Sequence, residues 1–383
     1  MSERVELRVD QRFRDYFTDL HQVFLYITDD CNLRCRHCLY KPLLANDSQI
    51  PLPTALGLIT TFRKMGATKL TIMGGEPTRY GHDQGYRPLL DVIRTARELG
   101  YERIRIDTNG QFRPELLDEP DFRLLDDISF SLDGHTPAIN DPLRGRGSHA
   151  RCVANLRAAV ERGYQAYITS CIHRGNVGQD EDGRFLIDSM IRFAAHVGVT
   201  GINFHGIFLH GVARDGWIED TYVSSEDYAQ MYTAVRAAID AGGYPIPVRL
   251  PQERLVTRAE FDADPAYFGY CPVKLAERVL VHPNGQIRIC SLLIGTPQAV
   301  ATFDDTGITW DDTDDNEITH GGFDLDHPTP CTNQTVDSGH IPVCVSFKPG
   351  QSEHVWANKL AWQPQQPVAA TCPKNTLSPT GQH

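Results

Sequence analysis

The chain of 383 residues is long enough for one large α/β domain with a smaller appendage, or for two ordinary domains. Hydrophobic residues make up 41% of the sequence and charged residues 22%, which is typical of a soluble globular protein with a sizeable core. The 37 Lys and Arg against 49 Asp and Glu give a formal net charge of −12. Because an acidic surface repels phosphate backbones, this balance argues against nucleic acid as a partner.

The sequence carries no signal for a membrane or for export. The longest apolar runs, such as residues 201–209, are far too short to span a bilayer. Residues 1–6 are charged and lack the apolar region of a signal peptide. We therefore expect a cytoplasmic chain, in which the ten cysteines stay reduced.

Between residues 20 and 250, short apolar runs alternate with amphipathic stretches. The runs predict strands at residues 23–28, 69–73, 103–107, 127–132, 166–172 and 201–208. The stretches predict helices at residues 54–65, 86–99, 114–117, 150–162, 183–197 and 224–241, and Gly66, Gly100, Gly163 and Gly198 are placed to end four of them. This alternation indicates parallel βαβ units, in an open doubly wound sheet or an incomplete barrel.

The pattern changes near residue 250. Residues 278–282 and 286–289 predict the two strands of a hairpin, because Asn284 and Gly285 stand at the turn between them. Residues 303–326 are acidic and polar, and the segment from residue 362 is rich in Pro, Gln and Thr. We expect an N-terminal extension at 1–20, a core at 21–250, a second domain at 251–350 and an irregular tail at 351–383.

Three cysteines directly follow the first predicted strand. Cys31, Cys35 and Cys38 place three thiols within eight residues, and closely spaced thiolates bind zinc or iron–sulfur clusters. In α/β folds, chemistry sits beyond the carboxyl ends of parallel strands, which is where this loop lies. The alternative is a set of inert or zinc-binding cysteines.

The spacing Cys-x₃-Cys-x₂-Cys resembles the signature of radical S-adenosylmethionine (SAM) enzymes, and further motifs follow in that family's order over residues 22–250. Residues 74–77 (GGEP) and 131–134 (SLDG) resemble two family motifs, and residues 108–110 (TNG) resemble a third. The resemblance implies a partial (βα)₆ TIM-like barrel, a [4Fe–4S] cluster held by Cys31, Cys35 and Cys38, and SAM as a second cofactor. It also implies a set of residues near SAM: Gly74, Gly75, Glu76, Asn109, Ser131, Asp133, Arg144 and His37.

Within that set, Glu76 and the backbone beside it would meet the methionine amino group of SAM. Ser131 and Asp133 would lie near the ribose and the carboxylate. His37 departs from the family, which usually has Phe, Tyr or Trp leaning on the adenine at this position. The resemblance further implies that an electron from the cluster cleaves SAM, and that the resulting 5′-deoxyadenosyl radical removes hydrogen from the substrate. An external donor such as flavodoxin or ferredoxin would supply the electron.

A second group of cysteines follows residue 250. Cys271-x₁₃-Gly285-x₄-Cys290 resembles the opening of the SPASM and twitch extensions of some radical SAM enzymes. The denser cysteine block of a full SPASM domain is absent from the sequence. The twitch-like arrangement therefore implies one auxiliary [4Fe–4S] cluster, with Cys331 and Cys344 as the remaining ligands and Cys372 as an alternative to either.

Two further cysteines and one histidine complete the candidates. Cys152 and Cys171, on a predicted helix and strand, fit core positions. Cys171 ends its strand, so it is also a candidate hydrogen-atom donor to a product radical. His205 is a candidate substrate-binding residue, because it faces inward near the carboxyl end of the sixth strand.

These features favour an enzyme acting on a small polar molecule such as a sugar, aminocyclitol or nucleoside in natural-product biosynthesis, for example of an antibiotic. Dehydrogenation, decarboxylation, dehydration and epimerisation all begin with the same hydrogen abstraction, and the sequence does not separate them. One alternative is SPASM-type modification of a ribosomal peptide or protein. The other is a non-catalytic iron–sulfur or zinc protein.

Overall fold

A computed structural model of the protein describes residues 6–38, 40–41, 43–44, 47–206, 223, 225–250, 252–257, 263, 276–289, 299–311 and 340–344. The chain divides into two compact units. The first contains Met1–Pro251 and Ala276–Asp324, and the second contains Gln252–Leu275 and Leu325–His383.

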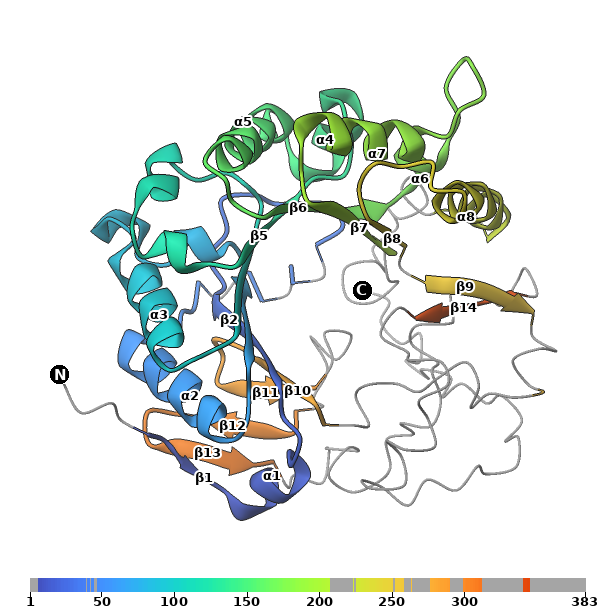
Figure 1. Cartoon of the computed structure of the whole chain (residues 1–383). Helices are drawn as coiled ribbons and strands as arrows, with labels where there is room; N and C mark the ends of the chain where they lie inside the picture. The colour runs from blue at the N-terminus through green and yellow to red at the C-terminus, as the bar shows by residue number, and fades with distance from the viewer. Residues whose placement is uncertain are drawn as a thin grey trace, which may run out of the picture. The chain divides into compact units, whose positions relative to one another are not determined.

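Six parallel strands form the centre of the first unit (Figure 1). Each pairs with the next one along the chain, so their order in the sheet is their order in the sequence. A doubly wound sheet would reverse its strand order at a switch point, so this order confirms the predicted partial βα barrel. The strands are β2 (Gln22–Thr28), β3 (Lys69–Gly74), β4 (Arg103–Thr108), β5 (Asp127–Ser131), β6 (Ala166–Ile172) and β7 (Gly201–Gly206).

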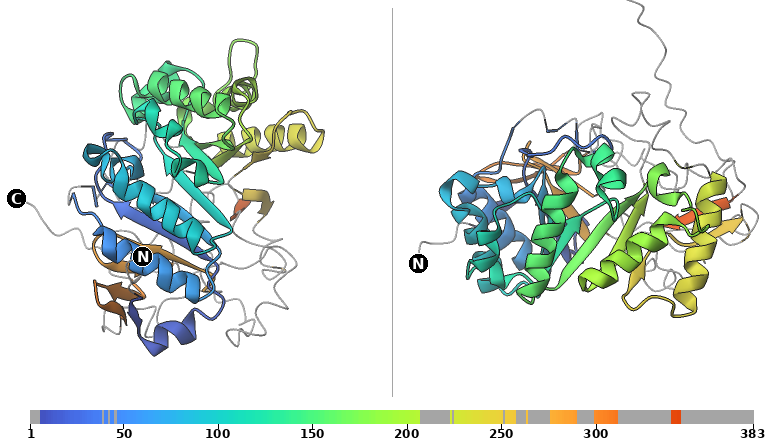
Figure 2. Two further views of the ribbon diagram at one scale, coloured as in Figure 1. Left: turned by 60° about the vertical axis from the view of Figure 1, so that its left-hand side comes forward. Right: turned by 90° about the horizontal axis from the view of Figure 1, so that it is seen from above.

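Helices lie along the outer side of this sheet (Figures 1 and 2). Helix α3 shows why: Leu89, Val92, Ile93 and Ala96 recur every three or four residues, and all four are fully buried. Gly100, with φ +81°, follows the helix in the left-handed conformation. The longer helices are α2 (Leu52–Lys64), α3 (Arg87–Glu98), α5 (Ser148–Glu161), α7 (Leu186–Val197) and α8 (Ser225–Asp240).

Shorter helical segments occupy several connections. The segment predicted as a helix at 114–117 is the 3₁₀ helix η3 (Pro114–Asp118). Helix α4 (Pro137–Arg144) was not predicted, and it contains Pro142, which disfavours a helix interior. The others are α1 (Gln11–Tyr16), α6 (Arg174–Val177), η1 (Pro77–Arg79), η2 (His82–Gln84) and η4 (Phe122–Leu124). None of the helices described is long and apolar enough to cross a membrane.

The predicted hairpin after residue 250 is confirmed, since β10 (Arg278–Val281) and β11 (Gln286–Arg288) pair antiparallel. Strand β10 also pairs in parallel with β2, which places the hairpin in the barrel sheet. β12 (Ala301–Phe303), β13 (Gly307–Trp310) and β1 (Arg8–Val9) extend this edge, and β8 (Val248–Arg249) extends the other. The sheet has twelve strands among the described residues. The domain limits at residues 20, 250 and 350 stay predictions. Strands on either side of residue 20 (β1 and β2) and on either side of residue 250 (β8 and β10) nevertheless belong to the same sheet.

In the second unit, β9 (Gln252–Thr257) pairs antiparallel with β14 (His340–Cys344). Cys344 is the last residue of β14. The other predicted auxiliary ligands, Cys271, Cys290 and Cys331, lie outside the described residues, as do Cys372 and the tail at 351–383. The auxiliary cluster and the twitch-like character of this part therefore stay predictions.

Candidate functional site

The three clustered cysteines lie in the loop that follows β2, at the carboxyl edge of the parallel sheet. Cys31, Cys35 and Cys38 are unpaired thiols, and each is partly buried. Cys31 lies near enough to the other two thiols to interact with them electrostatically. The structure thus brings together the three predicted cluster ligands.

The surroundings of these thiols fit a metal cluster. The backbone N–H of Leu33 donates to Cys31 Sγ at 3.4 Å, and the side-chain amide of Asn109 donates to the same sulfur at 3.8 Å. Burial raises the pKa of Cys31 to about 12 and that of Cys38 to about 11. Buried thiols of this kind need a bound cation to become thiolates, and three soft sulfur ligands suit iron.

Gly74 and Gly75 join β3 to the cysteine loop through close backbone contact. The N–H of Gly75 donates to the carbonyl of Thr28 at 2.7 Å, and the next N–H donates to the carbonyl of Asp30 at 2.8 Å. A Cβ on Gly75 would lie 2.5 Å from the Asp30 oxygen, and Gly74 has φ +150°. Both glycines are therefore required by the packing of this loop, besides the role in SAM binding that the resemblance implies.

Glu76 is 1% exposed, and its carboxylate is engaged by neighbouring loops of the protein. One oxygen accepts from Thr78 N at 3.1 Å, Thr78 Oγ1 at 2.7 Å and Thr108 Oγ1 at 2.7 Å. The other accepts from the Asn109 N–H at 2.7 Å. Burial raises the pKa of Glu76, and these hydrogen bonds oppose that rise. The side chain thus fixes the loop after β4 to the loop after β3, and Asn109 in turn contacts Cys31.

Asp133, fully buried after β5, is the centre of a second network. Arg144 donates to its two oxygens at 2.6 and 3.2 Å, and the N–H of Cys171 donates to one of them at 2.8 Å. His37 Nε2 lies 3.2 Å from the other oxygen. Burial opposes the charged carboxylate, but Arg144 and His37 outweigh it and lower the pKa of Asp133 to about 2. Two predicted SAM-site residues, Arg144 and His37, therefore both contact a third, Asp133.

The remaining candidates lie at the same edge. Ser131 ends β5 half-buried, and its carbonyl oxygen lies 3.7 Å from the thiol of the buried Cys152. Cys171 is half-buried, and its Sγ lies within 4.8 Å of ligand atoms of His37 and Asp133. His205 is exposed and pairs in register with Cys171. These positions are compatible with the predicted roles of Cys171 and His205, which stay predictions.

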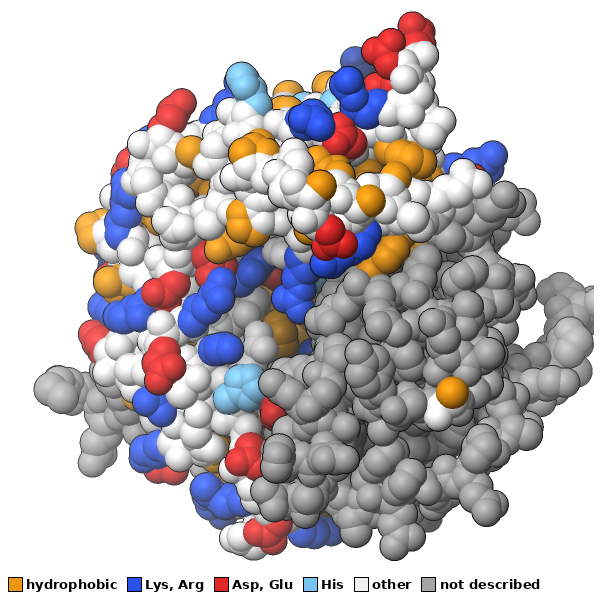
Figure 3. Space-filling view, turned by 45° about the vertical axis from the view of Figure 1, so that its right-hand side comes forward, with side chains coloured by type: hydrophobic (Ala, Val, Ile, Leu, Met, Phe, Trp, Pro, Cys, Tyr) orange, Lys and Arg blue, Asp and Glu red, His pale blue; other side chains and the backbone are white. Residues whose placement is uncertain are grey.

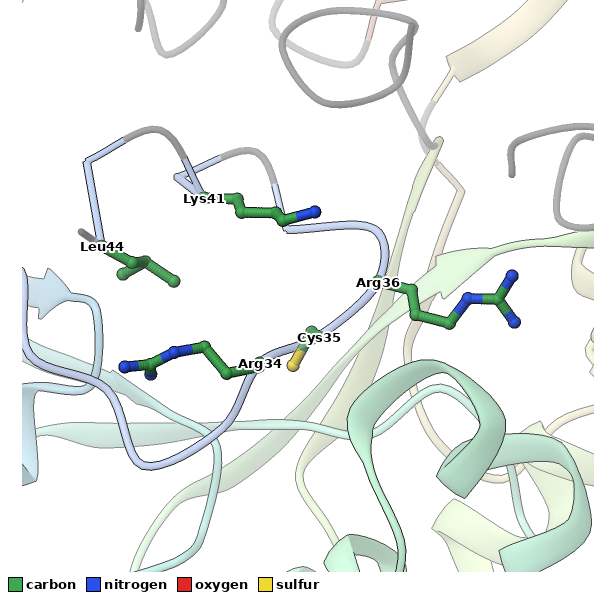
Figure 4. Close-up of a pocket in the computed structure, with 5 residues that line it drawn as sticks. All are labelled: Arg34, Cys35, Arg36, Lys41 and Leu44. Carbon is green, nitrogen blue, oxygen red and sulfur yellow. The ribbon is translucent and has the colours of Figure 1, made fainter. Parts of the chain in front are cut away.

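A hollow of about 260 Å³ lies against the cysteine loop, lined by Arg34, Cys35, Arg36, Lys41 and Leu44. Figure 4 shows Cys35 between Arg34 and Arg36, with Lys41 across the loop. The three cationic side chains are exposed. In a chain with net charge −12, this loop is locally basic. Figure 3, in which no residue is labelled, shows Lys and Arg side chains gathered on the described part of one face of the molecule.

The sequence interpretation missed a charged group on the face of the sheet turned away from the helices. Along β4, Ile104 and Ile106 are fully buried, so Arg105 and Asp107 lie on the opposite face. Arg105 Nε contacts Asp107 Oδ1 at 2.7 Å and Asp127 Oδ1 at 3.3 Å, and its guanidinium lies 5.7 Å from the Tyr167 ring centre. The alternation of charged and apolar residues in 103–107 was the available signal.

Comparison with known proteins shows which family the part of the chain around this site resembles. Residues 25–183 match the family model described as the Radical SAM superfamily. The chain is 31% identical over 186 residues to mycofactocin maturase MftC of Mycobacterium ulcerans (strain Agy99), which covers 47% of each chain. It is 32% identical over 134 residues to GTP 3′,8-cyclase of Limosilactobacillus fermentum, covering 34% of this chain and 39% of the relative. The matched part thus spans about half, or less, of these relatives.

Solved structures show a similar fold. SuiB of Streptococcus suis bound to precursor peptide SuiA has a TM-score of 0.56 at 17% identity, covering 81% of this chain and 68% of that one. Native anSMEcpe with bound AdoMet has a TM-score of 0.57 at 12% identity, covering 85% and 94%. Residues 25–183, which contain the three clustered cysteines, Glu76 and Asp133, therefore form a Radical SAM domain.

Proposed function

We propose that the chain is an enzyme that cleaves SAM reductively and abstracts hydrogen from a small polar, carbohydrate-type substrate in natural-product biosynthesis. The reaction is a dehydrogenation, decarboxylation, dehydration or epimerisation. One observation carries the proposal: the three thiols of Cys31, Cys35 and Cys38 and the buried networks of Glu76 and Asp133 meet at the carboxyl edge of one parallel sheet.

The superfamily uses a [4Fe–4S] cluster and SAM. Cys31, Cys35 and Cys38 would hold the cluster, and the loops anchored by Glu76 and Asp133 would line the place for SAM. Together the two cofactors supply the one-electron chemistry that removes hydrogen from an unactivated C–H bond. The chain's own part is to hold and orient. Glu76 fixes Asn109 beside the Cys31 sulfur, and Asp133 fixes Arg144 and the Cys171 backbone.

Charged residues on the face of the sheet turned away from the helices support the proposal of a polar substrate. Arg105, Asp107, Asp127 and the exposed His205 offer charged and hydrogen-bonding groups on strands β4, β5 and β7. An apolar substrate would displace water from these charged groups without replacing its hydrogen bonds, which costs binding energy. A relative named for a nucleotide, GTP 3′,8-cyclase, is consistent with this substrate class.

A second candidate is modification of a ribosomal peptide or protein. It is favoured by the similarity to a maturase over 186 residues. Incubation of the reduced enzyme with candidate peptides and with sugars or nucleosides separates the two. Substrate-dependent formation of 5′-deoxyadenosine with only one class identifies that class.

Two further parts of the proposal concern electron supply. An external flavodoxin or ferredoxin would deliver the electron, and the exposed cations Arg34, Arg36 and Lys41 suit an acidic donor. An auxiliary [4Fe–4S] cluster on Cys271, Cys290, Cys331 and Cys344 would accept an electron from the substrate. Iron and sulfide contents of about eight each per chain support two clusters, and contents of about four remove the second one.

Anaerobic reconstitution followed by reduction with dithionite tests the central proposal. We expect SAM to be converted to methionine and 5′-deoxyadenosine, measured by liquid chromatography and mass spectrometry. Cys35→Ala should abolish this conversion, because only two cluster thiols remain. Absence of SAM cleavage by wild-type protein that carries iron and sulfide would favour the non-catalytic iron–sulfur alternative.

A further inference from the structure

His37 lies between two predicted cluster ligands, one residue before Cys38 and two after Cys35. Its side chain is only 7% exposed, and its Nε2 faces the fully buried carboxylate of Asp133 at 3.2 Å. Its other ring nitrogen, Nδ1, is buried and makes no hydrogen bond with the described residues. The contact between Nε2 and Asp133 therefore fixes the orientation of the imidazole ring.

Asp133 is in turn held by residues outside the cysteine loop. Arg144, the last residue of α4, binds both carboxylate oxygens, and the N–H of Cys171 on β6 binds one of them. The N–H of Asp133 itself donates to the side chain of Asn140 at 3.0 Å. These hydrogen bonds hold the Asp133 carboxylate in place. The His37 side chain connects the cysteine loop to this carboxylate.

The backbone of the same loop is attached at a second point. The Arg36 N–H donates to the carbonyl of Leu143 in α4 at 2.8 Å, and Cys35 Sγ lies 4.0 Å from the carbonyl of Arg144. The loop is therefore fixed to α4 at two positions between Cys35 and Cys38, directly through the Arg36 backbone and indirectly through His37 and Asp133. Of these two positions, His37 is the one next to Cys38.

We propose that His37 is a positioning residue, which through Asp133 holds Cys35 and Cys38 in the arrangement that binds iron. This assignment rests on the proposed function of the three thiols. It adds a task to the adenine contact that the resemblance implies at this position, because a buried carboxylate contacts one edge of the ring. Residues outside the metal ligands commonly change metal affinity by fixing ligand orientation.

Three substitutions test the proposal with matched geometry. His37→Phe keeps a flat ring of similar size and removes Nε2. His37→Gln places an amide nitrogen near the position of Nε2, whereas His37→Asn places one near the position of Nδ1. The readouts are iron and sulfide per chain after anaerobic reconstitution, the rate of iron release to a chelator, and the unfolding midpoint of the metal-free protein.

We expect the Phe and Asn variants to release iron about ten- to a hundredfold faster than wild type, and the Gln variant to approach the wild-type rate. All variants should unfold near the wild-type midpoint. Wild-type release rates in the Phe variant would overturn the proposal, and so would equal losses in the folded Gln and Phe variants. The proposed function is tested independently of the role of His37. It would be wrong if wild-type protein with full iron content did not cleave SAM.

Discussion

Glu76 places one carboxylate among four donors from the loops after β3 and β4. Replacement by Gln keeps the size of the side chain but turns one acceptor into an N–H donor. At least one of the surrounding N–H or O–H groups then faces another donor inside the protein. The structure therefore makes the charge state of this side chain important for loop packing, independently of any ligand.

We predict that Glu76→Gln lowers the free energy of unfolding of the metal-free protein by about 1–3 kcal/mol, the cost of an unsatisfied buried polar group. Urea denaturation under anaerobic conditions measures this change. Glu115→Gln, at an exposed position, is the control and should stay within about 0.5 kcal/mol of wild type. Equal stability of the two variants would show that the Glu76 network does not stabilise the fold.

His282 is a second residue whose surroundings predict a measurable effect. It is fully buried just after β10 and stacked on Tyr26 with ring centres 4.4 Å apart. Within the described part of the chain, neither of its ring nitrogens makes a hydrogen bond. Burial, together with the charge of Arg288, lowers the pKa of His282 from 6.5 to about 3. The unfolded chain therefore takes up the proton first as the pH falls, so stability is lost between about pH 7 and pH 3.

We predict that wild type loses about 1.4 kcal/mol more stability than His282→Phe when the pH changes from 7.5 to 5.5, because the Phe variant has no proton to bind at this position. Phe keeps the stacking on Tyr26. Urea unfolding at both pH values measures the loss of stability in each protein. As the control, His196→Gln, at an exposed histidine, should lose as much stability as wild type. The same pH dependence in wild type and His282→Phe would contradict the assignment of a neutral His282.

At the scale of elements, the turn between β3 and η1 depends on the absence of a side chain at Gly75. We predict that Gly75→Ala destabilises the protein by about 1–3 kcal/mol and lowers iron content, because its Cβ would overlap the carbonyl oxygens of Asp29 and Asp30 at 2.6 and 2.5 Å. Urea unfolding and iron analysis check both effects.

Gly178 offers a matched control for this change. It also has an ordinary negative φ, but the nearest atom to its added Cβ would be Leu186 Cδ1 at 3.9 Å. Gly178→Ala should therefore be neutral, or stabilising through the smaller freedom of the unfolded chain. Similar costs at both glycines would mean that the close approach at Gly75 is not the cause.

The sequence predicted the strands from β2 to β7 because each forms a local apolar run, and several intervening helices end at glycines with positive φ. It did not predict the parallel pairing of β10 with β2. That pairing joins residues 22–25 to residues 278–281, and no pattern within either short strand identifies its partner. The edge strands β1 and β8, with two residues each, are too short to give a periodic signal.

For the site, the cysteine spacing was readable because Cys31, Cys35 and Cys38 are close in sequence. His37, Asp133 and Arg144 were each identified as candidates by resemblance. The contacts of His37 and Arg144 with Asp133 depend on how the cysteine loop and α4 pack around one buried carboxylate. Arg105 was missed because the alternation of charged and apolar residues in 103–107 shows only that the two faces of the strand differ. The assembled sheet is needed to show which of these faces the helices cover.

At the scale of the whole molecule, an acidic chain presents a basic group beside its cysteine loop. We predict that Lys41→Glu lowers the ratio of flavodoxin-driven to dithionite-driven SAM cleavage about tenfold at low salt, because flavodoxin-type donors are acidic and approach by electrostatic attraction. The difference should shrink as salt is added.

Lys69→Glu is the matched control for this experiment. It makes the same charge change at the exposed start of β3, at the opposite end of that strand from the cysteine loop. Its ratio should equal that of wild type. An unchanged ratio in Lys41→Glu, or an equal fall in both variants, would exclude the basic loop as the specific place where the donor approaches.

The pairing of β2 with β10 also has a consequence for biosynthesis. Residue 278 leaves the ribosome 256 residues after residue 22, the first residue that it pairs with. At a synthesis rate of 5–20 residues per second, one edge of β2 waits about 13–50 s for its neighbour. Throughout that interval, the strand that leads into the cysteines keeps a row of unpaired backbone groups. The nascent chain is therefore most exposed to aggregation, and to premature capture of metal, before its hairpin has been made.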